Sequence, residues 1–558
     1  MVDIYFDRYY RYAELTEILQ GWAEQYPQLC RLEKIGASYE GRDIWLMVVT
    51  NLATGPDTEN PAMWVDGNIH ATEVSASTAS LYLLHKLLTQ YGQDDKVTYA
   101  LDSRVFYVVP RLNPDGAEWA LADNPKWIRS STKPYPRTDQ LDGLIQEDID
   151  GNGRLLQMRL KDPHGAWKIH PDEPRLMIPR EPDDPPGGDY YRMLLEGRIQ
   201  NYDGVTIQHA AALQGLDLNR QFPVFWQPDQ AGAGDYPGRE PEPAAAMRFI
   251  ADHPNITGGI SFHTYSGVHL RPPTKGPETE LPTQDLRTFK KIGKKATELT
   301  GYPAVSVYHD FAYDPKNYIR GTFDDWLYEH LGVYAWTTEI WSMQKAAGVD
   351  HSKILDWFRD HPIEDDFKIF KWIDEELNGE GYVEWYAFDH PQLGQVELGG
   401  WDLFITIRNP PYKYLEKEVA PLADWAIFHG LISPKLELLK VAVESHGDLH
   451  HILFAVQNSG WLPTHITEQA LKMKVVRPLE FDIHLPEGAA LVSGEKKVMK
   501  GQLRGRDDKI QTPTWGGDDS DERAKVEWVV KAPAGTQVEL VATHKRAGVV
   551  RKMVTLGD

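Results

Sequence analysis

Cysteine is almost missing from this chain of 558 residues: Cys30 stands alone, so the sequence can form no intrachain disulfide. Disulfides accumulate in proteins of oxidising compartments. The first residues also lack the basic segment followed by an apolar one that marks a signal peptide. Both observations favour a cytoplasmic location.

Long apolar runs and basic clusters are missing as well. No run approaches the ~18–20 residues that a helix needs to cross a membrane, so no membrane span is expected. The net charge is −23, and no patch of interleaved basic and aromatic residues offsets it. Because such a chain repels polyanions, neither nucleic acid nor an anionic membrane is expected as a partner.

What the chain has is the composition and length of a large soluble protein. Hydrophobic residues make up 41% and charged residues 25%, values typical of globular domains. A length of 558 residues is enough for two domains or more.

Helical and extended patterns alternate through the first part of the chain. Helical periodicity covers 12–28, 73–92, 242–254 and 285–301, and strand-like runs cover 61–67, 104–109, 256–263 and 332–340. The run at 104–109 continues into a Pro-Asp-Gly sequence that predicts a turn. Such alternation predicts an α/β fold, with a mixed, mainly parallel sheet and helices on both faces.

Two segments depart from this pattern and suggest the domain organisation. Residues 130–212 are rich in Pro, Asp, Gly and Arg and too long for a plain loop, so we interpret them as an insertion that is functional or forms a rim. From about residue 434 only short strand patterns separated by turns occur, which predicts an all-β sandwich. We therefore expect a catalytic domain over 1–433 and an accessory β-sandwich over 434–558.

A pair of potential metal ligands lies where a strand gives way to a helix. The spacing His-x-x-Glu occurs five times, but only His70 and Glu73 directly follow a predicted strand and open a predicted helix. His263 ends another strand, and ligand sites of open α/β sheets form at such strand ends. A lone histidine at a strand end is more often an ordinary surface or core residue. Two histidines and one glutamate, however, are a known catalytic zinc set that leaves one position open for water.

Three further polar residues stand next to apolar runs. Asp217 could orient a ligating histidine, and Arg220 offers a planar fork suited to a carboxylate, although the same stretch could be a turn with a surface arginine. Glu339 ends a strongly apolar strand, where a carboxylate is costly unless it serves as a base with a raised pKa.

Taken in order, the segments GNIHATE, NPDG, DLNR, SFHTYS and GTFDDW followed by TTE resemble the zinc carboxypeptidases of the A/B type. The resemblance covers roughly residues 5–345. It implies that His70, Glu73 and His263 bind one zinc ion and that Glu339 is the general base. It further implies that Asn219 and Arg220 hold the terminal carboxylate of a peptide or protein substrate, and that Asp217 supports His70.

The sequence departs from the family pattern at several positions. Ile128 stands where the family has its oxyanion arginine, so we assign that role to Arg129, the next residue. Thr72 replaces the family's arginine between the first two ligands, and Tyr318 is one residue away from the place of the family's mobile tyrosine. Asp324 matches the pocket residue of the B type and predicts a preference for C-terminal Lys or Arg. It could equally be an acid in the first turn of a helix, where the dipole favours it.

A second metal site is suggested within the insertion. Asp148, Asp150 and Asn152 alternate ahead of Gly153, as in the first half of a calcium loop. Arg159 stands where such a loop has its glutamate, so an acidic turn is the alternative to a structural calcium site.

The function expected from the sequence is that of a zinc-dependent metallocarboxypeptidase. Two alternatives stay open: a zinc amidohydrolase or deacylase on the same fold, and a non-catalytic binding protein that keeps the fold. The presence of both histidines, Glu73 and Glu339 argues against the second.

Overall fold

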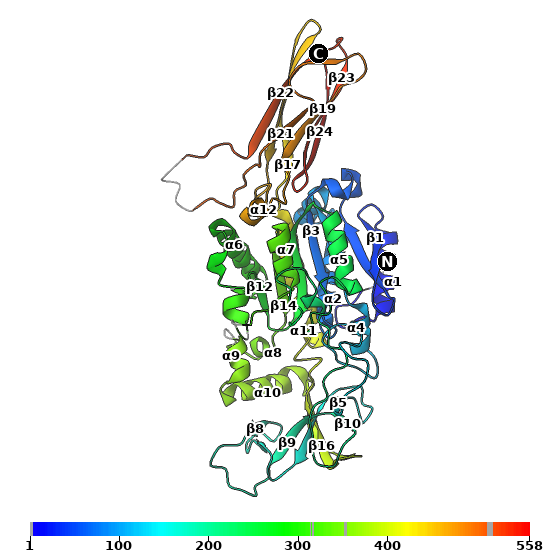
Figure 1. Ribbon diagram of the computed structural model, residues 1–558, viewed down its shortest axis with the longest axis vertical. Helices are drawn as coiled ribbons and strands as arrows, with labels where there is room; N and C mark the ends of the chain where they lie inside the picture. The colour runs from blue at the N-terminus through cyan, green and yellow to red at the C-terminus, as the bar shows by residue number, and fades with distance from the viewer. Residues whose placement is uncertain (1–3, 313, 315–316, 351–353, 511–516, 558) are drawn as a thin grey trace.

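The computed structural model describes residues 4–312, 314, 317–350, 354–510 and 517–557. Its centre is an eight-stranded sheet (Figure 1). In spatial order the strands are β1 (Cys30–Ala37), β2 (Asp43–Val49), β4 (Val105–Val109), β3 (Ala62–Gly67), β11 (Ile256–Thr264), β14 (Tyr334–Ile340), β12 (Val268–Arg271) and β13 (Ala304–Ser306).

The middle of this sheet is parallel and its borders are mixed. Strands β4, β3, β11 and β14 pair in parallel, whereas β1 with β2, β2 with β4, and β14 with β12 pair antiparallel. The expected mixed α/β sheet is therefore confirmed.

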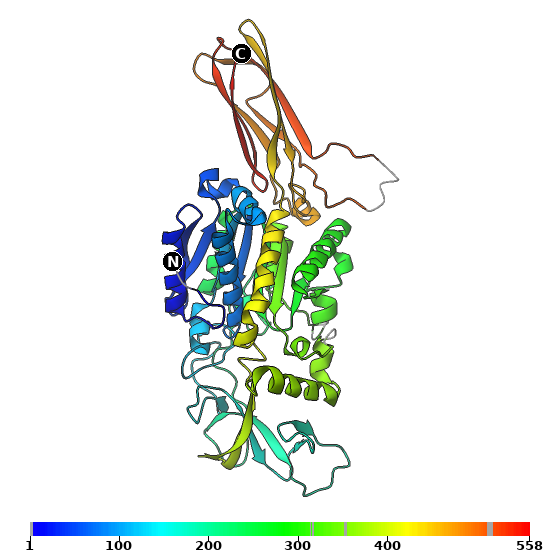
Figure 2. The ribbon, with the colours of Figure 1, turned by 180° about the vertical axis from the view of Figure 1, so that it is seen from behind.

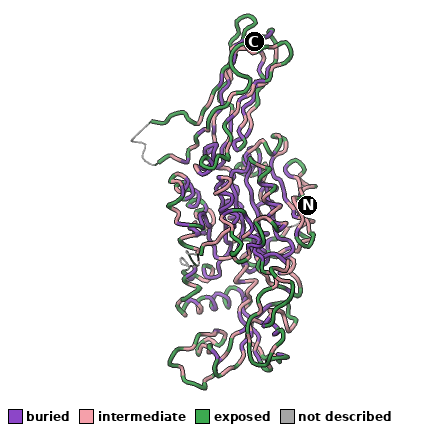
Figure 3. Tube along the Cα trace, viewed as in Figure 1, coloured by how far each residue is buried: buried purple, intermediate pink, exposed green. Residues whose placement is uncertain are grey.

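Helices cover both faces of the sheet, because the side chains of each strand alternate between two apolar cores. Met63 and Val65 of β3 point into one core and Trp64 into the other. The first core takes its helices from α1 (Tyr12–Gln25), α2 (Val74–Gln90), α3 (Asp95–Ser103), α6 (Thr283–Thr300) and α11 (Tyr412–Leu431), the side seen in Figure 2. The second takes α5 (Pro241–Asp252) and α7 (Phe323–Leu331). Buried residues concentrate in these layers (Figure 3).

The Pro-Asp-Gly sequence after β4 begins a helix, so the predicted turn was wrong there. Asn113 caps α4 (Pro114–Ala120), its side-chain oxygen accepting the N–H of Gly116 at 3.0 Å. Proline at the first helical position needs no N–H partner, which is why Asn-Pro-Asp-Gly can open a helix.

The segment 130–212 is more regular than its composition suggested. It contains β5 (Gly143–Gln146), β6 (Gln157–Lys161), β7 (Trp167–Ile169), β8 (Met177–Pro179), β9 (Tyr191–Leu195) and β10 (Gly197–Gln200). Strands β6 to β9 form a six-stranded sheet with β15 (Tyr382–His390) and β16 (Gly394–Trp401), from much later in the chain. Three helices lead to β15: α8 (Met343–Ala346), α9 (Ile354–Arg359) and α10 (Ile363–Leu377).

The C-terminal part is a pair of four-stranded sheets packed around Phe481 and Trp528. One sheet holds β17 (Leu436–His446), β18 (Leu449–Asn458), β22 (Arg523–Lys531) and β20 (Ala490–Ser493), and the other β21 (Lys497–Lys500), β19 (Leu479–His484), β23 (Gln537–His544) and β24 (Gly548–Thr555). The expected all-β sheets are confirmed, although a short helix, α12 (Glu468–Met473), interrupts them. The exact domain boundaries stay a prediction.

The two additions lie at opposite ends of the central sheet (Figure 1). Arg546 of the sandwich donates to the carbonyl of Gly332, just before β14 begins, so the sandwich meets the edge where the parallel strands start. The insertion sheet lies toward the edge where they end. Over the described residues, no helix is long and apolar enough to cross a membrane.

Candidate metal centre

Three potential ligands meet at the carboxyl edge of the parallel strands. His70 follows β3, Glu73 is the residue before α2, and His263 lies near the end of β11. All three are buried, and one donor atom from each lies within 4.8 Å of the others. The sequence prediction that these residues converge is thus matched by their placement.

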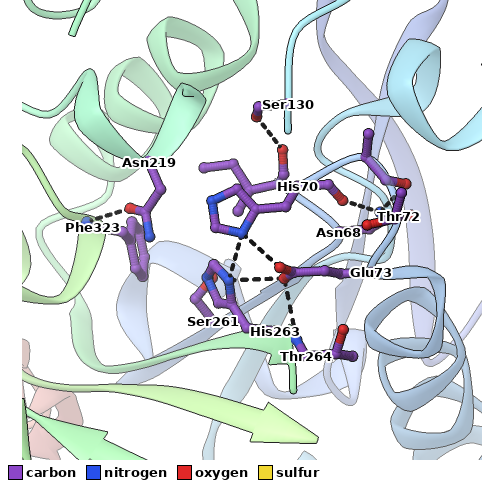
Figure 4. Close-up of polar contacts among 12 residues, drawn as sticks. Asn68, His70, Thr72, Glu73, Ser130, Asn219, Ser261, His263, Thr264 and Phe323 are labelled. Carbon is purple, nitrogen blue, oxygen red and sulfur yellow. Dashed lines mark hydrogen bonds and ion pairs between the residues drawn. The ribbon is translucent and has the colours of Figure 1, made fainter. Parts of the chain in front are cut away.

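Their contacts fit a cation better than an empty polar cluster (Figure 4). Nδ1 of His70 lies 3.0 Å from Nδ1 of His263 and 3.0 Å from Oε1 of Glu73, and Nδ1 of His263 lies 3.1 Å from Oε2 of Glu73. Two ring nitrogens facing each other at this distance repel unless a proton or a metal ion lies between them. Two imidazole nitrogens and a carboxylate oxygen form a donor set that suits zinc.

The other ring nitrogen of each histidine also has a partner, as in metal sites generally. Nε2 of His70 lies 3.2 Å from Oδ1 of Asp217, which is where the sequence placed this aspartate. Nε2 of His263 lies 3.2 Å from the hydroxyl of Ser261, which donates to Asp66 at 2.7 Å. Asp66 was missed, although an aspartate inside the apolar run of β3 was a visible signal.

The environment keeps Glu73 ionised. Burial alone would raise the pKa of this carboxyl, but the charges of His70 and His263 and their hydrogen bonds outweigh it and hold the pKa well below its usual range. The backbone N–H of Thr264 donates to Oε2 of Glu73 at 3.1 Å. An ionised, fixed carboxylate is the form that binds a metal.

Glu339 lies beside this trio on the neighbouring strand. It is the register partner of His263 in the β11–β14 pair. Its side chain is buried, and Oε2 has no hydrogen-bond partner within the described part of the chain. Burial raises the pKa of Glu339 to about 7, against the opposing charge of His263. A carboxyl group in this state can take up or release a proton near neutral pH.

Arg129 spans the space between the trio and Asp217. Its Nε donates to Oδ2 of Asp217 at 2.9 Å, and Nη1 lies 3.5 Å from Oε1 of Glu73. Its side chain is still 46% exposed. The guanidinium therefore has donors free to face a ligand, as the oxyanion role predicted for it requires.

Asn219 and Arg220 lie in a short 3-10 turn, Leu218–Arg220, that follows Asp217. The side-chain oxygen of Asn219 accepts the N–H of Phe323 at 2.9 Å, which leaves the amide nitrogen to point elsewhere. Nη2 of Arg220 lies 3.7 Å from Asp217. Both side chains line a cavity of about 80 Å³ together with His70, His263 and Glu339.

Asp324 lines the same cavity from the first turn of α7. Its carboxyl is buried, and this burial raises its pKa. The neighbouring Asp325 points away and accepts from Thr274 instead. Asp324 is thus both a first-turn acid and a wall of the cavity, so its placement accommodates either interpretation.

Tyr318 is not among the described residues that line this cavity. Its ring packs near Phe225, with a centroid separation of 6.4 Å, and beneath the guanidinium of Arg320. The structure does not bring it to the metal trio, and the substrate-binding role assigned to it stays a prediction.

In the suspected calcium loop, the carboxylate of Asp148 is occupied by backbone N–H groups of the loop itself. Asp148 accepts the N–H groups of Gly151, Asn152 and Gly153. Asp150 accepts the side-chain amide of Asn152 at 3.1 Å. Asp148 and Asp150 lie near the buried Glu196, but these contacts are those of an acidic turn, and calcium binding is not supported.

Arg408 was missed by the sequence analysis. It approaches the trio from the loop between β16 and α11, with Nη1 3.4 Å from the carbonyl oxygen of Thr264 and 4.0 Å from Oε1 of Glu73. No local pattern pointed to it, because its nearest neighbours in space are far away in the sequence.

Comparison with known proteins identifies relatives for both parts of the chain. A family model described as zinc carboxypeptidase matches residues 15–153 and 189–355, more than half of the chain. A model described as a domain of unknown function matches residues 435–555.

Individual relatives are distant. Carboxypeptidase B of Astacus astacus is 25% identical over 41% of this chain and 66% of its own length, and carboxypeptidase A1 of Mus musculus is 23% identical over 60% and 62%. The chain thus spans less than two thirds of the length of these relatives. Among solved structures, a thrombin activatable fibrinolysis inhibitor matches with a TM-score of 0.42 and 17% identity, over 76% of this chain and 74% of that one.

Proposed function

Since this chain belongs to the zinc carboxypeptidase family, we propose that it is a zinc-dependent enzyme that hydrolyses the C-terminal peptide bond of peptides or proteins. The observation that carries the proposal is one cavity that unites His70 and His263, the buried Glu339, and the Asn219–Arg220 pair. A metal centre, a base and a carboxylate clamp are the parts that an exopeptidase of this kind needs.

His70, Glu73 and His263 would hold the zinc ion. When bound, zinc acts as a Lewis acid that polarises a carbonyl and makes a water molecule more acidic. Glu339 takes a proton from the attacking water and passes it to the leaving amine, because its pKa of about 7 lets the carboxyl work in both directions.

The two arginines of the site have separate tasks. Arg220 with Asn219 binds the free carboxylate of the substrate, since a guanidinium fork matches a carboxylate in geometry and charge. Arg129, held by Asp217, donates to the oxygen that becomes negative as the carbonyl is attacked. The clamp limits the enzyme to chain ends.

Asp324 supports a preference for C-terminal Lys or Arg. The cavity that it lines is mainly polar, but part of its wall is apolar: Leu270, Val307, Phe311 and Ile319. Long basic side chains combine an apolar stem with a charged head, so such a wall would cover the stem and the aspartate would pair with the head. The net charge of −23 would also attract cationic peptides at long range.

The test is cleavage of peptides that differ only in the last residue (Lys, Arg, Phe, Leu or Glu), followed by mass spectrometry with and without a zinc chelator. Loss of one C-terminal residue that stops on chelation is expected, fastest for Lys and Arg. Equal rates for all five would remove the role of Asp324. No cleavage by the zinc-loaded protein would favour the amidohydrolase or the non-catalytic alternative.

A further inference from the structure

A second pocket, of about 320 Å³, lies next to the metal centre. Arg129 lines both this pocket and the cavity that contains Asn219 and Arg220, so the two meet at that residue. Thr72, the residue before the ligand Glu73, is also part of its wall. A substrate whose last residue occupies the cavity would therefore continue past Arg129 into this pocket.

The far wall of the pocket is a loop that is fixed to the metal centre. The side chain of Asn409, fully buried, donates to the carbonyl of Thr72 at 2.8 Å and accepts the N–H of Ser75 at 3.0 Å. Nε1 of Trp341 donates to the carbonyl of Thr406 at 2.6 Å. These bonds hold Arg408, between the two anchored residues, against the first turn of α2.

The guanidinium of Arg408 makes only long polar contacts with the rest of the protein. Its contacts with Thr264 and Glu73, at 3.4 and 4.0 Å, are long, and its side chain is 41% exposed. None of the described residues that line the pocket is acidic, although the chain as a whole carries −23. Glu73 and Asp217 contact these arginines from the adjoining metal site, but among the described lining residues the only charged groups that the pocket presents to a ligand are the two guanidinium groups.

The remaining wall is apolar. Trp127 and Phe404 stack with ring centroids 5.8 Å apart, and Leu403 and Ile407 complete the surface. A ligand group that suits both parts has an aliphatic stem and a negative end.

We propose that Arg408 selects an acidic side chain, Asp or Glu, at the residue just before the bond that is cut. The inference rests on the proposed function, because that function fixes which end of the peptide occupies the cavity. Arg408 would pair with the carboxylate of this penultimate residue, and the apolar wall would cover its stem. The loop that carries Arg408 lies outside the segments that match the zinc carboxypeptidase model.

The test compares three peptides that differ only in the penultimate residue, Glu, Gln or Lys, before one common C-terminal residue. We expect kcat/KM to be about tenfold higher for Glu than for Gln, and lower still for Lys. In Arg408→Ala the Glu-to-Gln ratio should fall to near one, and in Arg408→Glu the order of Glu and Lys should reverse. Arg192→Ala is the control, because this arginine of the insertion sheet is similarly exposed, at 48%, and should keep the ratio.

A purely structural role for Arg408 predicts a different result. If it only supported Glu73, its removal would lower the rate for all three peptides alike and leave their ratio unchanged, which would overturn the proposal. If the protein cleaves none of the peptides, the preference of Arg408 can still be tested by binding. The measurement is then the dissociation constant of each peptide for the zinc-loaded Glu339→Gln variant. Binding without a preference for Glu, or a preference for Glu that survives Arg408→Ala, would also contradict the proposed role of Arg408.

Discussion

At the scale of a single residue, Glu339 is the position at which metal binding and turnover can be tested separately. It is buried beside the trio, but in the described structure it is not part of the group of residues that could ligate the metal. We expect Glu339→Gln to keep the zinc content and to lower kcat by about 10²–10⁴-fold, the usual contribution of a general base. Zinc analysis and peptide cleavage on the same sample measure both. A fully active variant would remove Glu339 from this role.

Glu242 is a matched control for Glu339, because burial raises the pKa of both glutamates to about 7. Its ionisation also predicts a pH effect on stability. It is buried at the start of α5, where Oε1 accepts the N–H of Tyr39 and Oε2 has no partner in the part of the chain described. Burial raises its pKa from 4.5 to about 7. The folded state therefore keeps a proton that the unfolded state loses, so this group costs stability as the pH rises from about 4.5 to 7, and the full cost remains above 7.

Glu242→Gln removes that cost. The variant should match the parent near pH 4 and be more stable at pH 8, by up to ~3 kcal/mol from the shift in pKa. Urea unfolding at the two pH values measures the difference. An equal effect at both would show that the proton of Glu242 is not involved. Activity should be unchanged, because no described residue of α5 lines the cavity.

At the scale of helices and strands, the sequence predicts the central layers well and the insertion poorly. The runs around Met63 and Ile260 are continuous and apolar because parallel strands are buried on both faces. Strands β6 to β9 are short, lie among Pro and Gly, and are completed by β15 and β16. The pairing of β6 with β16 joins Arg159 to Glu397, 238 positions later in the sequence. No local pattern encodes such contacts.

The same contrast between local patterns and long-range contacts explains which site residues could be predicted from the sequence. His70, Glu73 and His263 were predictable because strand ends of one sheet meet at one edge. Arg408 was not, because Asn409 joins its loop to Thr72 across 337 positions in the sequence. Residues placed by regular elements are visible in a sequence, whereas residues placed by one long-range hydrogen bond are not.

The contact of β3 with α2 is the element-scale feature on which the ligands depend. A Cβ at Gly67 would lie 2.5 Å from the carbonyl oxygen of Ala76, in the helix that follows Glu73. Gly67→Ala must push α2 away from the strand, so we expect a loss of ~1–3 kcal/mol in stability and weaker zinc binding. Unfolding and chelator competition measure the two effects. Gly501→Ala, where a Cβ meets nothing within 4 Å, should show neither.

At the scale of the molecule, the sandwich lies at the edge of the central sheet where the parallel strands start (Figure 1), and the candidate metal centre lies at the edge where they end. The sandwich is attached by buried polar contacts: Asp285 of α6 accepts the N–H groups of Glu468 and Gln469 at 2.7 and 3.0 Å. Arg546 donates to the carbonyls of Gly332 and His465 at 3.2 and 3.1 Å, and also to that of Leu331. This junction should therefore affect stability without affecting catalysis.

Arg546→Met tests that separation. The guanidinium is buried, which lowers its pKa to about 10. Its loss removes a donor from three carbonyls, of which those of Gly332 and His465 keep Thr467 as a donor, so we expect ~2–4 kcal/mol of destabilisation. The kcat/KM of the folded fraction should stay within about twofold, because the metal centre lies at the other edge. Arg551→Ala, which breaks an exposed pair with Glu59, should cost no more than ~1 kcal/mol. Loss of activity in Arg546→Met under conditions where it is fully folded would mean that the sandwich communicates with the metal centre through the sheet, and the two ends could then no longer be treated as independent.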